Sequence, residues 1–154
     1  MYISIVEDEH IYKSHNKTLL LYHLVFPLKY RKELLTEESG GTLVSICREV
    51  SERYEFEFIK IGYESDHVHF LIQSIPNVSV SQMVRTIKSI TAREMFRLHP
   101  DIEAKLWGGN FWSSGFYANT VGLYASKDVI QRYVENQGKE KEYKEVHSGQ
   151  LKLF

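Results

Sequence analysis

The chain has 154 residues, of which 43% are apolar and 25% charged, as expected for one soluble domain that buries a sizeable core. It has no run of about 18 apolar residues, which argues against a membrane span, and its single cysteine, Cys47, cannot form an internal disulfide. We therefore expect a cytoplasmic protein that forms one domain over residues 1–154. The net charge of −1 does not by itself indicate a nucleic-acid partner.

An apolar run of strand length opens the predicted fold, after an N-terminal extension over residues 1–15. The strand covers residues 17–26 and is followed by Pro27, which cannot donate a hydrogen bond to a neighbouring strand. A basic turn over residues 29–32 comes next. Apolar residues then recur at spacings of three and four within residues 36–54, which predicts a helix.

Two strands and a second helix are predicted in the middle of the chain. One strand begins at residues 56–59. Polar and apolar residues alternate along residues 66–73, a pattern that only a strand explains. Ser79 and Gln82 have the spacing of a capping box at the start of a long helix. At helical spacing this helix has an apolar face of Val80, Met83, Val84, Ile87 and Leu98, and an opposite face of Arg85, Lys88, Ser89 and Arg93.

The last part of the sequence predicts a further strand and a C-terminal helix. Residues 106–117 are rich in glycine and aromatic residues and indicate a strand and a turn. A helix is predicted over residues 126–138, with Ser126 as its cap and Gly138 at its end, before a tail over residues 139–154. The order of elements predicts an α+β protein with a ferredoxin-like, split βαβ antiparallel sheet and an extra C-terminal helix.

Two histidines on the strand over residues 66–73 form the first candidate site. His67 and His69 are two residues apart, so both imidazoles project from one face of the sheet while Val68 points into the core. Neighbouring imidazoles on a rigid strand suit a divalent metal ion. The pattern is short, and roughly 0.3 such pairs are expected by chance at this histidine content. Two surface histidines beside a turn remain the alternative.

Tyr133 and Gln137 lie four residues apart on the predicted C-terminal helix and so share a face. Tyr133 also falls between Val129 and Ile130 on the helical wheel, which leaves a buried core aromatic as the alternative. A phenol with a pKa of about 10 is a poor nucleophile, but it can attack a phosphodiester that a metal ion polarises. The resulting tyrosine ester conserves the bond energy needed to join a second DNA end.

Four parts of the sequence resemble the HUH single-tyrosine transposases of the insertion sequence 200/605 family (TnpA-like). These parts are the two-histidine strand, the block LWGGNFWSSGFY over residues 106–117, the helix IQRYVENQG over residues 130–138, and the opening strand with its basic turn, YHLVFPLKYR, over residues 22–31. The resemblance runs from about residue 15 to the end of the chain, with matching order and spacing.

The resemblance implies an RRM-like HUH fold and a transposase that cleaves and rejoins single-stranded DNA at hairpin-flanked element ends. Tyr133 would become linked to a 5′-phosphate and release a 3′-hydroxyl. His67, His69 and Gln137 would hold Mg²⁺ or Mn²⁺. Glu64 lies where some relatives carry an additional acidic ligand, although on an unbroken strand it would face away from the histidines. Such enzymes are homodimers in which the tyrosine helix often acts in trans, and they need no nucleotide cofactor.

Basic residues in two places are candidates for contact with DNA phosphates. The candidate DNA-binding residues are Lys29, Tyr30, Arg31 and Lys32 after the first strand, and Arg85, Lys88 and Arg93 on the long helix. Base stacking is possible for four aromatic residues, His23, Tyr30, Trp107 and Trp112. The alternatives are a solvated basic helix face and, for the tryptophans, packing beside the sheet edge.

Four other functions fit parts of the same pattern. A nuclease could use the histidines with water as the nucleophile, and it would form no tyrosine adduct. An RNA-binding module of the RRM type would share the sheet but would leave the histidines and Gln137 unexplained. A histidine-triad hydrolase fits less well, because Leu71 occupies the next position on the histidine face. An inactive or domesticated relative that only binds hairpin DNA or RNA could have a sequence just like this one.

Overall fold

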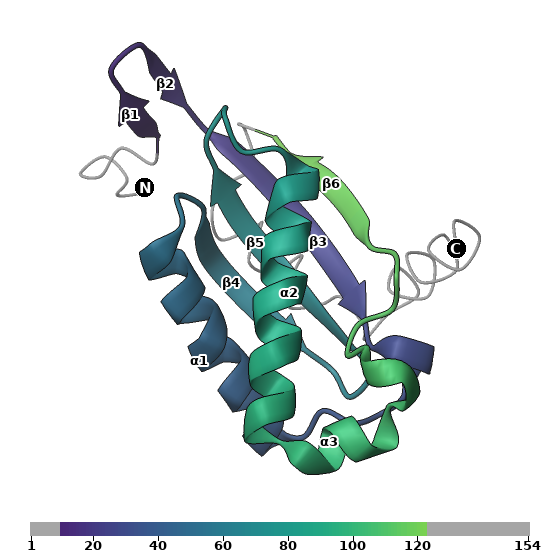
Figure 1. Cartoon of the computed structure of the whole chain (residues 1–154). Helices are drawn as coiled ribbons and strands as arrows, with labels where there is room; N and C mark the ends of the chain where they lie inside the picture. Colours follow the sequence, from purple (N-terminus) through teal and green to yellow (C-terminus); the bar gives the residue numbers. More distant parts are fainter. Residues whose placement is uncertain (1–9, 123–154) are drawn as a thin grey trace.

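The structure is a computed structural model that describes residues 10–122 (Figure 1). The strands are β1 (Ile11–Lys13), β2 (Asn16–Thr18), β3 (Leu20–Pro27), β4 (Glu57–Tyr63), β5 (His67–Ser74) and β6 (Tyr117–Val121). The α-helices are α1 (Glu37–Arg53), α2 (Val80–Leu98) and α3 (Pro100–Lys105), and two short 3₁₀ turns cover Lys29–Arg31 and Trp107–Gly109. The predicted helix with Tyr133 and Gln137 lies outside the described residues.

Four strands form one antiparallel sheet in the order β4-β5-β3-β6. β3 pairs with β5 along its whole length, from Leu20 opposite Ser74 to Pro27 opposite His67. α1 and α2 lie side by side across one face of this sheet (Figure 1). This strand order, with one helix after β3 and one after β5, is the ferredoxin-like split βαβ arrangement, so the predicted fold class is confirmed.

The main core lies between the sheet and the two long helices. Alternate residues of β3 and β5 point into it, as the strand periodicity predicts. The core residues of these strands are Leu24, Phe26, Val68, Phe70 and Ile72, and they pack against Leu43, Ile46, Cys47 and Val50 of α1 and Met83, Val84 and Ile87 of α2. Leu98, predicted on the apolar face of α2, is instead 45% exposed, because the helix ends at this residue and the chain turns into α3.

Capping boxes set the first residue of both long helices. The predicted box of α2 is present: Gln82 N–H donates to Ser79 Oγ at 3.1 Å, and Ser79 N–H donates to Gln82 Oε1 at 2.7 Å. α1 has a second box in which Thr36 and Ser39 exchange the same two bonds. This second box was not predicted from the sequence, because serine stands where glutamate or glutamine is usual.

Two stretches differ from the sequence prediction. The strand predicted over residues 17–26 is divided near Leu19, because β2 pairs with β1 in a separate hairpin whereas β3 joins the main sheet. The block over residues 106–117 contains little strand, since Gly108 and Gly109 adopt φ angles of 83° and 72° that suit a turn, and β6 begins only at Tyr117. A run of apolar or aromatic residues does not show at which residue the chain stops pairing with one strand and begins to pair with another. Within residues 10–122, none of the helices has the length and apolarity needed to cross a membrane.

Candidate active site

Three buried histidines lie in a row on the sheet face that points away from the helices. His67 and His69 of β5 are 0% and 3% exposed, and their rings are nearly parallel with centroids 5.9 Å apart. His23 of β3 comes next, also fully buried, with its ring centroid 6.2 Å from that of His69. Both imidazoles of β5 thus share one face, and their burial contradicts the alternative of two surface histidines beside a turn.

Asp66 orients the His67 ring. His67 Nδ1 lies 2.8 Å from Asp66 Oδ1 and donates to it, so Nε2 is the nitrogen that would bind a metal. Carboxylates commonly orient metal-binding imidazoles in this way. Burial lowers the pKa of His67, and the opposing effect of Asp66 is smaller, so the ring is neutral near pH 7, as a metal ligand must be. Asp66 was not among the predicted site residues, although a carboxylate directly before His67 is a signal that the sequence carries.

Arg31 in turn holds Asp66. Its Nη2 donates to Asp66 Oδ2 at 3.1 Å. Its Nη1 is buried and has no hydrogen-bond partner among the described residues. Burial alone raises the pKa of Asp66, but the bonds to His67 and Arg31 outweigh it and lower the pKa overall, which keeps the carboxylate ionised. Arg31 Nη1 is thus a guanidinium donor near His67 without an acceptor within residues 10–122, and such a donor is suited to bind an anionic oxygen.

Tyr30 and Arg31 both have left-handed backbone conformations, with φ angles of 60° and 53°. Such angles are uncommon in residues other than glycine and often occur at functional turns. The turn directs the Arg31 side chain toward Asp66 and leaves the Tyr30 ring 61% exposed. Lys29 Nζ lies 5.2 Å from the centroid of that ring.

Gly62 of β4 makes room for the His69 ring. The two residues are directly opposite in the β4–β5 pairing, so both face the same side of the sheet. A β-carbon added at Gly62 would lie 2.8 Å from His69 Nε2 and closer still to Cε1. Gly62 could not be predicted from the sequence, because its contact with His69 depends on the register of β4 and β5.

We expect Gly62→Ala to weaken Mn²⁺ binding by roughly tenfold to a hundredfold, the usual effect of disturbing a group that supports a metal ligand. The added methyl group must push the His69 imidazole from its position. Titration followed by electron paramagnetic resonance of free Mn²⁺ measures the affinity directly. Gly41→Ala is the matched control, because no atom lies within 4 Å of its added β-carbon. A folded Gly62→Ala variant with unchanged affinity would contradict this role.

Glu64 lies on the histidine face, contrary to the expectation for an unbroken strand. β4 ends at Tyr63, and Glu64 N–H donates to the His67 carbonyl oxygen at 2.9 Å across the turn between the strands. The pair Tyr63–Val68 therefore continues to Glu64–His67, and opposite residues of an antiparallel pair share a face. Among residues 10–122, no three His, Cys, Asp or Glu side chains are arranged to hold a metal ion. A ligand role for Glu64 stays a prediction.

His23 packs against β6 as well as against His69. Its Nδ1 is 3.2 Å from Asn119 Oδ1, and its ring meets that of Tyr117 edge-on at a centroid distance of 6.4 Å. Burial lowers the pKa of His23 to about 4, which the bond to Asn119 opposes only in part, so this ring too is neutral. The expectation that His23 stacks on DNA bases is not met, because the ring is fully buried.

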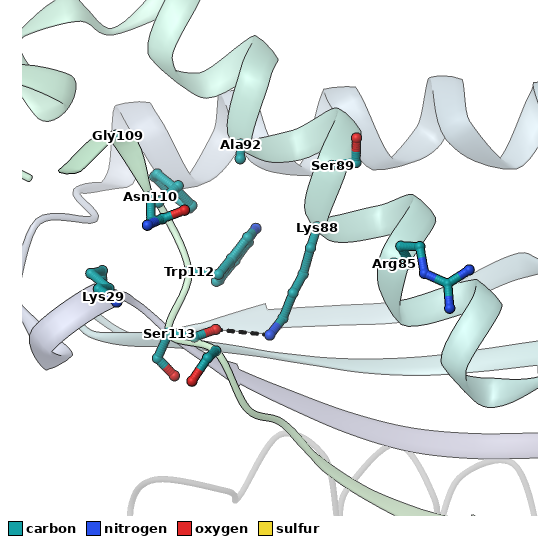
Figure 2. Close-up of a pocket in the computed structure, with 11 residues that line it drawn as sticks. Lys29, Arg85, Lys88, Ser89, Ala92, Gly109, Asn110, Trp112 and Ser113 are labelled. Atoms are coloured by element: carbon teal, nitrogen blue, oxygen red, sulfur yellow. Dashed lines mark hydrogen bonds between the residues drawn. The ribbon is translucent and has the colours of Figure 1, made fainter. Parts of the chain in front are cut away.

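Two residues predicted to contact DNA, Lys88 and Trp112, form hydrogen bonds within the protein. Lys88 Nζ donates to the backbone oxygen of Ser113 at 2.8 Å (Figure 2). It also donates to that of Gly115 at 2.8 Å, and burial lowers its pKa to about 8. Lys88 thus fixes residues 113–115 to α2 and does not project freely into solvent as the helical wheel predicts. Trp112 is 5% exposed and its Nε1–H donates to Thr91 Oγ1 at 2.9 Å, so the packing alternative is confirmed for this tryptophan.

The remaining predicted DNA contacts lie nearer the surface. Lys32 Nζ donates to the carbonyl oxygen of Lys105 at 2.8 Å, and Arg93 lies 3.8 Å from Glu94. Arg85 is exposed, and it makes no ion pair or hydrogen bond within residues 10–122. DNA binding by these side chains stays a prediction.

The sheet order and the paired imidazoles define an α+β protein of the ferredoxin-like class with a two-histidine site on the sheet face opposite the helices. The family described as "Transposase IS200 like" matches residues 16–137, which include both histidines and residues 133 and 137. The chain therefore belongs to the IS200-like (insertion sequence 200/605) transposase family, whose members process DNA.

Relatives of known name agree with this assignment. The ISDra2 transposase TnpA of Deinococcus radiodurans is 35% identical over 118 residues, which cover 77% of this chain and 84% of that protein. The IS200 transposase of Salmonella typhimurium is 29% identical over 124 residues, 80% of each chain.

Solved structures share the fold. A crystal structure of a candidate transposase from Deinococcus radiodurans R1 has a TM-score of 0.68 and 30% identity, and the match covers 82% of this chain and 97% of that one. A REP-associated tyrosine transposase bound to a REP hairpin has a TM-score of 0.52 and 17% identity, over 80% of this chain and 67% of that one.

Proposed function

We propose that this transposase cleaves and rejoins single-stranded DNA through a covalent 5′-phosphotyrosine link on Tyr133, with a divalent metal ion held by His67, His69 and Gln137. The observation that carries the proposal is the pair of imidazoles buried side by side on one face of β5, with the His67 ring oriented by Asp66. A carboxylate that fixes the tautomer of one ring is the arrangement expected around a metal-binding imidazole.

The donor set fits Mg²⁺ or Mn²⁺. Two imidazoles and one amide oxygen leave coordination positions open for phosphate oxygens, and imidazole suits Mn²⁺ better than Mg²⁺. The ion would polarise the scissile phosphate and stabilise the charge that develops on its oxygens. Glu64 would add a carboxylate from the same face as the histidines.

Residues of this chain supply the rest of the proposed chemistry. The Tyr133 oxygen forms a bond to phosphorus as its proton leaves, the bond from phosphorus to the 3′ oxygen breaks, and that oxygen takes up a proton as a 3′-hydroxyl. Arg31 Nη1 is available to donate to a phosphate oxygen beside His67. Joining is the reverse reaction, with the 3′-hydroxyl of another strand as the nucleophile.

We propose hairpins of single-stranded DNA at the element ends as the substrate, recognised by a homodimer in which the tyrosine helix acts in cis or in trans. The relative bound to a REP hairpin supports this class of DNA. Phosphate contacts are proposed for the basic turn and for α2, with the residues Lys29, Tyr30, Arg31, Lys32, Arg85, Lys88 and Arg93.

Mass spectrometry tests the proposal most directly. After incubation with single-stranded hairpin DNA and Mn²⁺, we expect the peptide that contains Tyr133 to gain the mass of a DNA fragment attached through its 5′-phosphate. A nuclease that uses water would instead leave free 5′-phosphate ends and unmodified protein. Hairpin binding with neither cleavage nor adduct would indicate an inactive relative and would refute the proposal.

A further inference from the structure

A cleft of about 430 Å³ lies between α2 and the segment over residues 109–114. Among the described residues, its lining includes three basic side chains and several neutral polar ones, and no acidic residue. The polar lining residues used below are Lys29, Arg85, Lys88, Ser89, Asn110 and Ser114. This volume is in the range of small-ligand sites. The lining therefore suits an anionic ligand the size of one nucleotide.

Two of the cations that line the cleft come from different elements, and neither has an acidic partner among the described residues. Lys29 comes from the turn after β3 and Arg85 from α2, and Figure 2 shows them on opposite sides of Lys88 and Trp112. Within residues 10–122, neither Lys29 nor Arg85 forms an ion pair. Two uncompensated charges across one cleft attract phosphate groups, whereas paired surface charges such as Arg97–Glu94 do not.

The walls of the cleft are held in place before any ligand binds. Lys88 ties residues 113–115 to α2, and Trp112 donates to Thr91 within α2. The same segment pairs with the end of β3, where Lys29 N–H donates to the Phe111 carbonyl oxygen at 2.9 Å. Asn110 and Ser114 are exposed at the mouth, so an amide and a hydroxyl are available to the polar edge of a base.

We propose that this cleft binds an unpaired nucleotide of the DNA strand, with the phosphate at one of its ends near Lys29, the phosphate at its other end near Arg85, and its base near Asn110. The inference rests on the proposed function and adds a second DNA-binding site, on the helix side of the sheet. Lys29 lies two residues after Pro27, which is paired with His67. A strand that passes around this end of the sheet can therefore reach both the cleft and the histidines.

Fluorescence anisotropy with two DNA molecules tests the proposal. One is a hairpin with single-stranded flanks, and the other is the same hairpin with a blunt end. The full chain carries Tyr133→Phe and the buffer contains a chelator, so that no cleavage occurs. The test variants are the double substitution Lys29→Gln with Arg85→Gln, and Asn110→Ala. Arg97→Gln is the control, because it removes a positive charge of α2 that is paired with Glu94 at 2.7 Å.

For the double variant we expect affinity for the flanked hairpin to fall about tenfold or more, with the blunt hairpin changed far less. The slope of log affinity against log salt concentration on flanked DNA should decrease by about 1.4, or about 0.7 for each lost single-strand phosphate contact. Asn110→Ala should weaken only flanked binding, and Arg97→Gln should weaken neither. Equal losses on both DNAs, or no loss, would overturn the proposal. If the unchanged protein formed no adduct on Tyr133, the proposed function would be contradicted. The proposed cleft would still be tested by the difference in affinity between flanked and blunt hairpins.

Discussion

Tyr133→Phe is expected to abolish strand cleavage, with a loss of at least about 1,000-fold, while hairpin binding persists. The substitution removes only the hydroxyl that would attack phosphorus. Phenylalanine preserves the packing of an aromatic ring, so a purely structural tyrosine would tolerate the change. Denaturing gels of end-labelled single-stranded DNA measure cleavage, and fluorescence anisotropy measures binding.

Tyr54→Phe is the matched control for this variant, because Tyr54 is 41% exposed at the end of α1 and its hydroxyl has no role in the proposed cleavage step or in the proposed DNA contacts. Cleavage by this control should remain close to that of the unchanged protein. If Tyr133→Phe still cut DNA at a measurable rate, Tyr133 would not be the nucleophile. The two-histidine site would then be better explained by a nuclease that activates water.

His69→Ala is expected to reduce metal-dependent cleavage by roughly two to four orders of magnitude, because one of the imidazoles that would bind the ion is lost. Mn²⁺ affinity should fall in parallel, which separates a ligand role from a loss of DNA binding. Both quantities are measured across a Mn²⁺ titration, with cleavage on gels and free Mn²⁺ by electron paramagnetic resonance.

His99→Ala provides the control for this second variant. His99 follows α2 on the helix side, and its Nε2 lies 3.0 Å from Thr42 Oγ1, away from the histidine row. The control should keep its cleavage rate and its Mn²⁺ affinity. Thermal melting shows whether His69→Ala is folded. Equal rates for a folded His69→Ala variant and the unchanged protein at every Mn²⁺ concentration would rule out the proposed ligand role.

The basic residues of the turn after β3 have different partners in the structure. In sequence, Lys29, Arg31 and Lys32 form one positive cluster with one expected role. In the structure, Arg31 binds Asp66, which also binds His67. Lys29 instead lines the cleft on the helix side of the sheet. The left-handed conformations of Tyr30 and Arg31 provide the sharp change of direction that separates these side chains.

Local periodicity was enough to determine which residues of β5 share a face. Alternation places His67 and His69 together and Val68 in the core, because successive side chains of any strand point to opposite sides. The capping box at Ser79 likewise located the start of α2, since its bonds join residues only three apart. The fold class followed from the order of these elements. Each of these features depends on short-range geometry that a sequence carries directly.

The surroundings of the histidines were decided only by the tertiary structure. Arg31 and Asp66 are 35 residues apart, and Gly62 meets His69 only through the β4–β5 register. Alternation along one unbroken strand predicts that Glu64 faces away from the histidines. The chain instead turns back after β4, so Glu64 lies opposite His67 and on the same face. Strand pairing and turn geometry determine which distant side chains meet, and these depend on the packing of the whole domain and not on the spacing of residues along the chain.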